Sequence, residues 1–153
     1  MTPVGSIRFR LARLTGRFVT RTAALLTGGR MPPFVSASVV VVVRERVLVV
    51  HDPIRAEAVL PGGHLRWREL PTVGAMRETL EETGYSVACR ALVGVYAGKQ
   101  EAGELGIVRV VYAGEVVAGS LQSSAEGKAE WLPLQTYAAS AARDAPIVRD
   151  WMA

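Results

Sequence analysis

The chain has 153 residues, of which half are hydrophobic and 21% are charged, as expected for one globular domain with its own core and not for a disordered chain. Its net charge of +4 is unevenly distributed, because residues 1–33 hold six arginines and no acidic residue. Residues 34–153 therefore carry a net charge of 4 − 6 = −2, which argues against a broad nucleic-acid-binding face on that part of the chain. The single cysteine, Cys89, excludes an internal disulfide framework and favours a cytoplasmic location. The longest apolar run, residues 34–43, is too short for a transmembrane segment, which needs about 20 residues.

Residues 6–27 place apolar side chains at helical spacing beside four arginines, and the Gly28–Gly29 and Pro32–Pro33 pairs would end this helix. The sequence therefore predicts a basic amphipathic arm, 1–33, ahead of a domain at 34–153. We favour packing of the arm on the core or on a second subunit, as in a homodimer. Attachment to an anionic membrane and binding to RNA stay open. The acid-free composition also resembles an organelle transit peptide.

Residues 34–153 alternate between strand and helix patterns. The valine-rich run 35–43 is too continuous for a one-sided strand, so it should be buried on both faces, and 44–46 should turn it into a return strand at 47–51. The other expected elements are strands at 57–60, 86–96, 106–117 and around Trp131, and helices at 71–83, 134–142 and 145–152. This order predicts an α/β or α+β sandwich with a mixed sheet.

The helix at 71–83 has clear boundaries, because Pro71 suits the first helical position and Gly84 suits a C-terminal cap. On a period of 3.6 residues, Val73, Met76 and Leu80 fall on one face, which we expect to be the apolar face.

Three glutamates, Glu78, Glu81 and Glu82, crowd one turn on the opposite face of this helix. A divalent cation would remove their mutual repulsion, and an all-oxygen ligand set suits Mg²⁺ or Mn²⁺ better than Zn²⁺. The preceding Gly62–Gly63 pair allows the backbone to approach a ligand closely. On base rates alone, a solvated helix face would be the commoner explanation.

Two further charged residues complete the pattern. Glu69 lies just before the helix, where the helix dipole favours a negative charge, and Arg77 can pair with it or with Glu81. The complete run is Gly63-x5-Glu69-x7-Arg77-Glu78-Thr79-Leu80-Glu81-Glu82-Thr83-Gly84-Tyr85. It resembles the Nudix box, the signature of the Nudix hydrolases, and the Pro-Gly-Gly-His-Leu run looks MutT-like. The resemblance covers roughly residues 34–140, and Thr79 stands where the family usually has an aliphatic residue.

The resemblance implies a Nudix-type α/β/α sandwich and metal-dependent attack of water on a diphosphate phosphorus. Glu78 and Glu82 would be the main metal ligands, with Glu81 as a further ligand and the carbonyl of Gly62 completing the site. The general base would be one of these glutamates or an acid from a later loop, for which Glu126 is the candidate. Glu69 and Arg77 would have a structural role, as a brace between loop and helix.

The loop before the helix departs from the family pattern. Arg68 replaces a usual glycine, and Leu70 replaces a small polar residue that would cap the helix. Arg66 and Arg68 could contact substrate phosphates, although a solvated loop is the commoner explanation for surface arginines. Trp67 could stack on a base or pack within the loop, and His64 could contact a phosphate or ribose.

We expect a small nucleotide substrate, with nucleoside triphosphates favoured and ADP-ribose or nucleotide sugars as alternatives. Outside the enzyme class, a nucleotide-sensing Nudix module would also fit, although the intact box counts against it. A protein acting on RNA ends is a further alternative, kept open by the basic arm and opposed by the mildly acidic remainder.

Overall fold

The computed structural model describes residues 33–52, 57–97, 106–124 and 127–153. The expected helix at 6–27 and the candidate base Glu126 lie outside these ranges.

Within the described part of the chain, seven strands form one mixed sheet in the order β3-β2-β1-β6-β5, with β4 added to β1 and β7 added to β2. The pairing of β1 with β6 is parallel and the others are antiparallel. The strands are β1 Phe34–Val43, β2 Arg46–Asp52, β3 Glu57–Val59, β4 Gly62–His64, β5 Tyr85–Ala97, β6 Ile107–Gly119 and β7 Lys128–Pro133.

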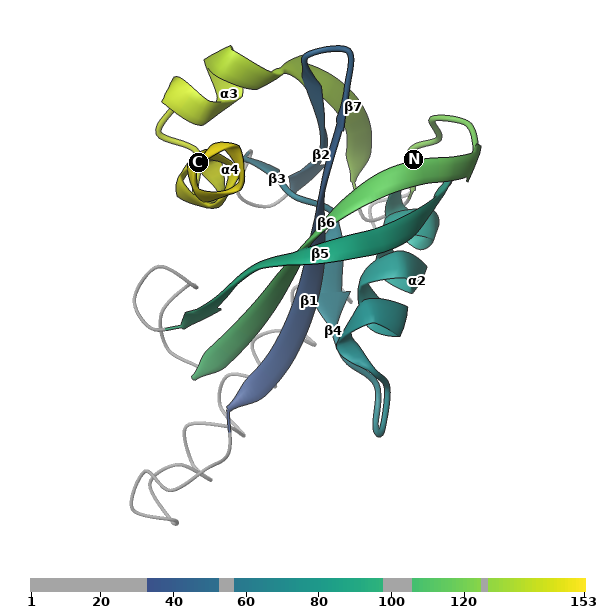
Figure 1. Ribbon diagram of the computed structural model, residues 1–153. Coiled ribbons are helices and arrows are strands. Elements are labelled where there is room, and N and C mark those ends of the chain that lie inside the picture. The colour runs from purple at the N-terminus through teal and green to yellow at the C-terminus, as the bar shows by residue number, and fades with distance from the viewer. Residues whose placement is uncertain (1–32, 53–56, 98–105, 125–126) are drawn as a thin grey trace, which may run out of the picture.

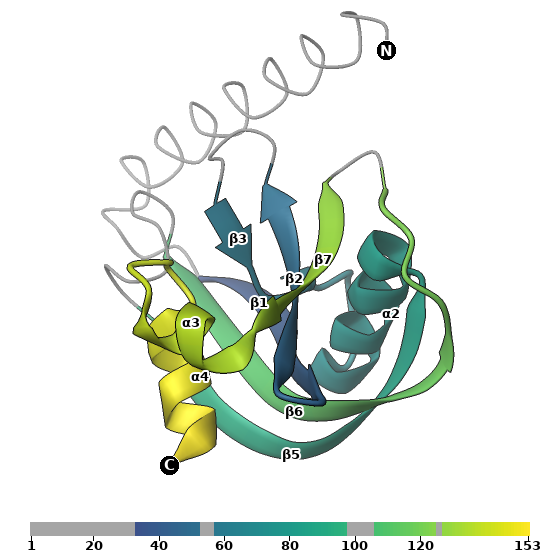
Figure 2. The ribbon, with the colours of Figure 1, turned by 90° about the horizontal axis from the view of Figure 1, so that it is seen from above.

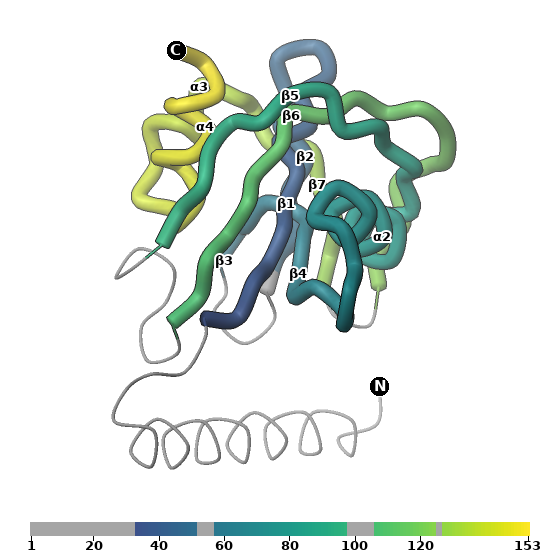
Figure 3. The backbone as a smooth tube through the Cα atoms, turned by 60° about the horizontal axis from the view of Figure 1, so that its bottom comes forward, coloured from purple at the N-terminus to yellow at the C-terminus, as the bar shows by residue number. Residues whose placement is uncertain are grey.

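Helices cover the sheet on two sides (Figures 1 and 2). Helix α2, Pro71–Thr83, lies on one side, and α3, Leu134–Ala139, lies with α4, Ala145–Met152, on the other. The tube in Figure 3 shows the same separation, with β1 running between the two groups of helices. This arrangement confirms the α/β/α sandwich. Among the described residues, no helix is both long and apolar enough to cross a lipid bilayer.

Strand β1 is the centre of the core, as its valine run predicts. Residues 36–41 are buried, and alternate side chains enter two clusters. Val39 and Val41 pack with Ala75 on the side of α2, whereas Val40 packs with Val148 on the side of α3 and α4. Burying a valine side chain contributes about 1.5–3 kcal/mol, so this strand is a major source of stability.

Helix α2 begins at Pro71 and ends before Gly84, which adopts the left-handed φ of 75° expected of the cap. The predicted apolar face holds only in part: Met76 packs partly buried against the core, whereas Val73 is 45% exposed and Leu80 is 48% exposed. The buried positions carry small side chains instead: Gly74, Ala75, Thr79 and Thr83.

Small residues allow α2 to pack closely. A Cβ atom on Gly74 would lie 2.4 Å from Cδ2 of Leu65, so no larger residue fits there without movement. The buried hydroxyls of Thr79 and Thr83 donate to the backbone oxygens of Ala75, at 2.7 Å, and Thr79, at 2.6 Å. These bonds satisfy the polar groups of the buried face, and they explain why Thr79 is accepted at a usually aliphatic position.

Two details differ from the sequence prediction. Gly62–His64 forms the short strand β4, paired with residues 36–38 of β1, which is not among the strands expected from the sequence. Helix α3 ends at Ala139 and not at 142, where the backbone of Ser140 becomes extended. The β1–β2 turn is where it was expected, and Arg44 and Glu45 adopt left-handed φ values of 49° and 61°.

Candidate active site

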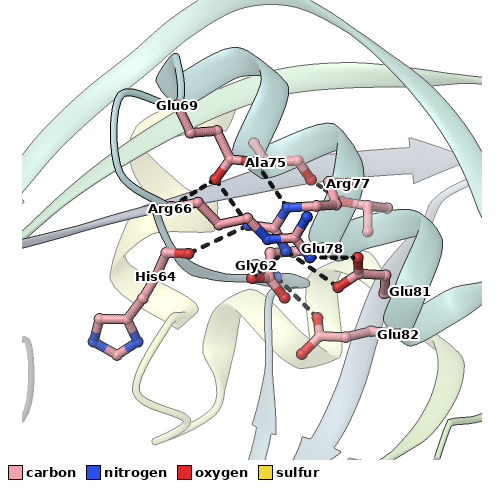
Figure 4. Close-up of polar contacts among 10 residues, drawn as sticks. Gly62, His64, Arg66, Glu69, Ala75, Arg77, Glu78, Glu81 and Glu82 are labelled. Atoms are coloured by element: carbon pink, nitrogen blue, oxygen red, sulfur yellow. Dashed lines mark hydrogen bonds and ion pairs between the residues drawn. The ribbon is translucent and has the colours of Figure 1, made fainter.

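The backbone of Gly62 lies against Glu82 (Figure 4), and the backbone of Gly63 lies against Glu78. The amide of Gly62 donates to Oε2 of Glu82 at 2.9 Å. A Cβ atom on Gly63 would lie 2.6 Å from Cδ of Glu78 and within 2.8 Å of both its carboxylate oxygens. Glycine is therefore required at position 63 for the Glu78 carboxylate to reach this place.

Arg77 holds the loop and the helix together. Its guanidinium donates two hydrogen bonds to the carboxylate of Glu69, at 2.8 and 2.9 Å, and further bonds to Glu78, at 2.7 Å, and Glu81, at 3.1 Å. The hydrogen bond from Arg77, with one from the amide of Arg66, lowers the pKa of Glu69 to about 2. The same contact with Glu69 raises the pKa of Arg77. Arg77 thus makes both of its expected pairings at once.

The basic loop before α2 divides into residues that contact this cluster and residues that do not. The Arg66 guanidinium donates to Glu81 at 3.2 Å, while the Trp67 side chain is 90% exposed. Arg68 adopts a φ of 62°, a left-handed conformation that glycine adopts without strain. This conformation gives a physical reason for the glycine that the family usually has at this position.

His64 is oriented away from the glutamates. Figure 4 shows its imidazole pointing away from the carboxylates, while its backbone oxygen accepts a bond from Arg77 at 3.3 Å. The imidazole packs edge-on against the ring of Phe34, with a centroid distance of 6.2 Å. The other histidine, His51, lies 2.9 Å from Oε2 of Glu130 through its Nε2 atom.

The described residues contain no three His, Cys, Asp or Glu side chains that are already arranged to hold a metal ion. The donor chemistry nevertheless fits a hard divalent cation, because Glu78 and Glu82 offer oxygen atoms beside a glycine backbone. The Glu78 carboxylate occupies the space that a Cβ atom on Gly63 would fill. Guanidinium groups from Arg66 and Arg77 currently balance the carboxylates of Glu78 and Glu81.

The buried ion pair between Arg109 and Asp144, which contacts the segment just before Gly62, was not anticipated from the sequence. Asp144 is fully buried, and its carboxylate accepts bonds from the guanidinium of Arg109 at 2.7 and 2.9 Å and from the amide of Leu60 at 2.8 Å. Burial alone would raise the pKa of Asp144, but Arg109, Arg143 and the Leu60 amide outweigh it and keep the pKa below its usual value. Arg109 also donates to Oγ of Ser38 at 2.9 Å.

A weak signal for this pair exists in the sequence. Arg109 interrupts the apolar run 107–113, whereas Asp144 stands just before α4, where a helix-capping acid is common. A charge inside an apolar strand needs a buried partner, but the sequence does not say which acid supplies it.

Comparisons with known proteins bear on this site. A model of the NUDIX domain matches residues 32–152. The chain belongs to the Nudix hydrolase family. Members of this family generally use divalent cations and act on small nucleotides. A protein described as "MutT-like protein" from Streptomyces ambofaciens is 39% identical over 105 residues, which cover 66% of each chain.

Another relative, described as "ADP-ribose pyrophosphatase", comes from Methanocaldococcus jannaschii. It is 27% identical over 103 residues, which cover 67% of this Nudix chain and 61% of the relative. The chain therefore spans slightly less than two thirds of the length of both curated relatives.

Solved structures share the fold. A NUDIX hydrolase from Nitrosomonas europaea superposes with a TM-score of 0.68 at 24% identity, over 79% of this chain and 89% of the other. A MutT protein from Methanosarcina mazei Go1 gives 0.66 at 23% identity, over 80% and 96%. At such identities these likenesses confirm the Nudix fold and do not name a substrate.

Proposed function

We propose that this chain is a divalent-metal-dependent hydrolase that cleaves a pyrophosphate linkage in a small nucleoside diphosphate derivative, with nucleoside triphosphates as the favoured class. The observation that carries the proposal is the contact of the Gly62–Gly63 backbone with the carboxylates of Glu78 and Glu82. Carboxylate oxygens are ligands that Mg²⁺ and Mn²⁺ prefer, and glycine allows the backbone, with its carbonyl groups, to approach them closely.

In this proposal Mg²⁺ or Mn²⁺ is held by Glu78, Glu82 and the carbonyl of Gly62, with Glu81 as a further ligand. The bound cation supplies Lewis acidity, which activates water and offsets charge on the phosphates. Arg77 keeps the carboxylates oriented through its contacts with Glu69 and Glu78.

Loading the site requires the carboxylates of Glu78 and Glu81 to share or release their guanidinium partners, Arg77 and Arg66. The proton of the attacking water passes to one of the helix glutamates, with Glu126 as the alternative acceptor.

The loop before α2 is the proposed phosphate-facing side of the substrate site. Arg66 forms an ion pair with Glu81, and in the proposed complex its guanidinium binds a substrate phosphate in place of that carboxylate. Arg68 supplies a second guanidinium for the phosphates. Trp67 is free of packing over most of its surface, which suits stacking on a base. His64 presents its imidazole beside Phe34, away from the carboxylates, so of its two predicted contacts, phosphate and ribose, we propose the ribose.

The names of the relatives define the substrate alternatives. The relative named as an ADP-ribose pyrophosphatase makes ADP-ribose the first alternative to nucleoside triphosphates, followed by nucleotide sugars. We also propose a cytoplasmic enzyme, from its single cysteine, and a homodimer. Binding of RNA through the basic arm stays a prediction.

The test is release of phosphate or pyrophosphate from nucleoside triphosphates, ADP-ribose, nucleotide sugars and dinucleoside polyphosphates, with Mg²⁺, with Mn²⁺ and with EDTA. We expect turnover of at least one substrate that EDTA abolishes. Glu82→Gln should lower kcat by about 100-fold or more, because it removes a charged ligand from the proposed metal site.

The matched control for this variant is Glu115→Gln, which alters an exposed ion pair with Arg90 on the β5–β6 pair and should leave kcat unchanged. Full activity in Glu82→Gln would refute the proposed metal site. Absence of turnover on the whole panel, with measurable nucleotide binding, would favour a sensing module instead.

A further inference from the structure

The segment that carries Gly62 is held by three different elements. The amide of Leu60 donates to Asp144 at the start of α4, the carbonyl of Pro61 accepts from Val39 of β1 at 3.1 Å, and the amide of Gly62 donates to Glu82 of α2. Each of these three successive residues is thus tied to a separate part of the fold.

The buried ion pair also touches this segment from a second direction. Arg109 donates through Nε to Oγ of Ser38, which is paired with Gly62 across β1 and β4. A Cβ on Gly62 would lie only 2.2 Å from this Oγ, so the Ser38 hydroxyl is packed against the Gly62 backbone. Asp144 therefore acts on residues 60–62 both directly, through Leu60, and indirectly, through Arg109 and Ser38.

Stability alone does not account well for such a pair. Burying two charges costs desolvation free energy, and replacing a buried ion pair by apolar residues of similar size is often neutral or stabilising. What an apolar pair cannot supply is an acceptor for the Leu60 amide, which lies on a residue only 2% exposed. The distinctive contribution of Asp144 is therefore the placement of this segment.

We propose that Asp144 is a positioning residue that holds residues 60–62 so that Gly62 faces Glu82. The inference rests on the proposed function, because Gly62 and Glu82 are there the ligands of the cation. It predicts that the α4 end of the molecule controls the affinity of a metal site formed by the loop and α2, without Asp144 contacting the metal or the substrate.

The test compares two double variants that both remove the ion pair. Arg109→Met with Asp144→Leu leaves no acceptor for Leu60, whereas Arg109→Met with Asp144→Asn keeps an amide oxygen at that place. The readouts are hydrogen exchange of the Gly62 amide by NMR without metal, the Kd for Mn²⁺ by electron paramagnetic resonance, and kcat and KM separately.

We expect the Met/Leu variant to raise the Mn²⁺ Kd by about tenfold or more, as is usual when the support of a metal ligand is lost. Exchange of the Gly62 amide should accelerate by a similar factor of about ten, because its bond to Glu82 opens more often. The loss in activity should fall mainly on kcat, since the reacting geometry and not substrate affinity is disturbed. The Met/Asn variant keeps an acceptor for Leu60 but loses the bond from Arg109 to Ser38, so it should lie between the parent and the Met/Leu variant in all three readouts. The control Glu115→Gln should match the parent.

Equal Gly62 exchange and equal Mn²⁺ affinity in the two double variants would overturn the proposal and leave the pair a purely structural role. If the Met/Leu variant does not fold, Asp144→Glu replaces it, since it keeps a charge for Arg109 but shifts the carboxylate relative to Leu60. Unchanged Gly62 exchange in that variant would equally overturn the proposal. A parent protein that binds no Mn²⁺ and cleaves nothing would refute the proposed function alone, because the exchange of Gly62 still tests the positioning.

Discussion

Alanine at position 63 is the most direct perturbation of the candidate site. Its Cβ would lie 2.6 Å from Cδ of Glu78, where two carbon atoms normally approach to about 3.5 Å, so the carboxyl group must move by about 1 Å. Because the obstacle is the end of a flexible side chain, the free energy of unfolding should fall by only about 1 kcal/mol. A displacement of about 1 Å from the reactive geometry can lower kcat by about 100-fold, which corresponds to about 2.7 kcal/mol.

The assay measures kcat on the best substrate of the panel, the Kd for Mn²⁺ and urea unfolding, for Gly63→Ala and for Gly106→Ala. Gly106 is the matched control, because the nearest atom to its added Cβ would be Cβ of Pro33 at 3.8 Å. We expect Gly63→Ala to lose activity and metal affinity while it keeps its fold, and Gly106→Ala to keep all three. Parent-like kcat and Mn²⁺ affinity in Gly63→Ala would refute the role given to the Glu78 carboxylate.

Three further predictions concern the loop and the start of α2. Gly62→Ala should lower the free energy of unfolding by about 3 kcal/mol or more in urea titrations. The reason is that Gly62 has a φ of 150° and that an added Cβ would lie 2.3 Å from the backbone oxygen of Ala37. A loss below about 1 kcal/mol would contradict this. The pKa of Glu69 is lowered from 4.5 to about 2, so its contribution to stability is complete above pH 4.5 and disappears as the pH falls toward 2. In EDTA, Glu69→Gln should therefore show a shallower acid dependence of the urea midpoint than the parent, and parallel curves would disprove the assignment. Leu70→Ser should raise the stability by about 1 kcal/mol in thermal unfolding, because the N-cap residue makes no side-chain hydrogen bond at present; an unchanged Tm would count against a vacant cap.

Local signals predicted the boundaries of the fold well. Proline at the start of α2 and glycine after its end act through backbone geometry alone, so Pro71 and Gly84 could be interpreted without knowing what the helix packs against. The long valine run likewise predicted a strand buried on both faces, as residues 36–41 are, because a strand with one solvated face usually alternates apolar and polar residues.

The packing face of α2 could not be predicted in this way. Hydrophobic periodicity assumes that the largest apolar side chains are buried, which selects Val73 and Leu80. The helix instead packs through Ala75 and Thr79, because close approach to the sheet requires small side chains. The charged brace of Arg77 was predictable from local spacing, since its carboxylate partners lie within eight residues of it.

The pairing of Arg109 with Asp144 depends on tertiary structure. The two residues are 35 positions apart, and nothing local distinguishes Asp144 from an ordinary helix-capping acid. Glycines 62 and 63 were rightly expected to allow close approach of the backbone, but the strand that they form follows only from the presence of β1 beside them.

The bond between Leu60 and Asp144 has a consequence for synthesis on the ribosome. The two residues are separated by 84 positions, and at about 5–20 residues per second the acceptor follows the donor by about 4–17 seconds. Once Thr83 has been added, and until Asp144 follows, the nascent chain holds Gly62, Gly63 and helix α2 but not the carboxylate that the Leu60 amide requires. Final ordering of residues 60–62 is thus a late step of folding. A nascent chain whose synthesis stops in β7 would contain the glutamates of α2, but its residues 60–62 would lack the bond to Asp144 that holds them.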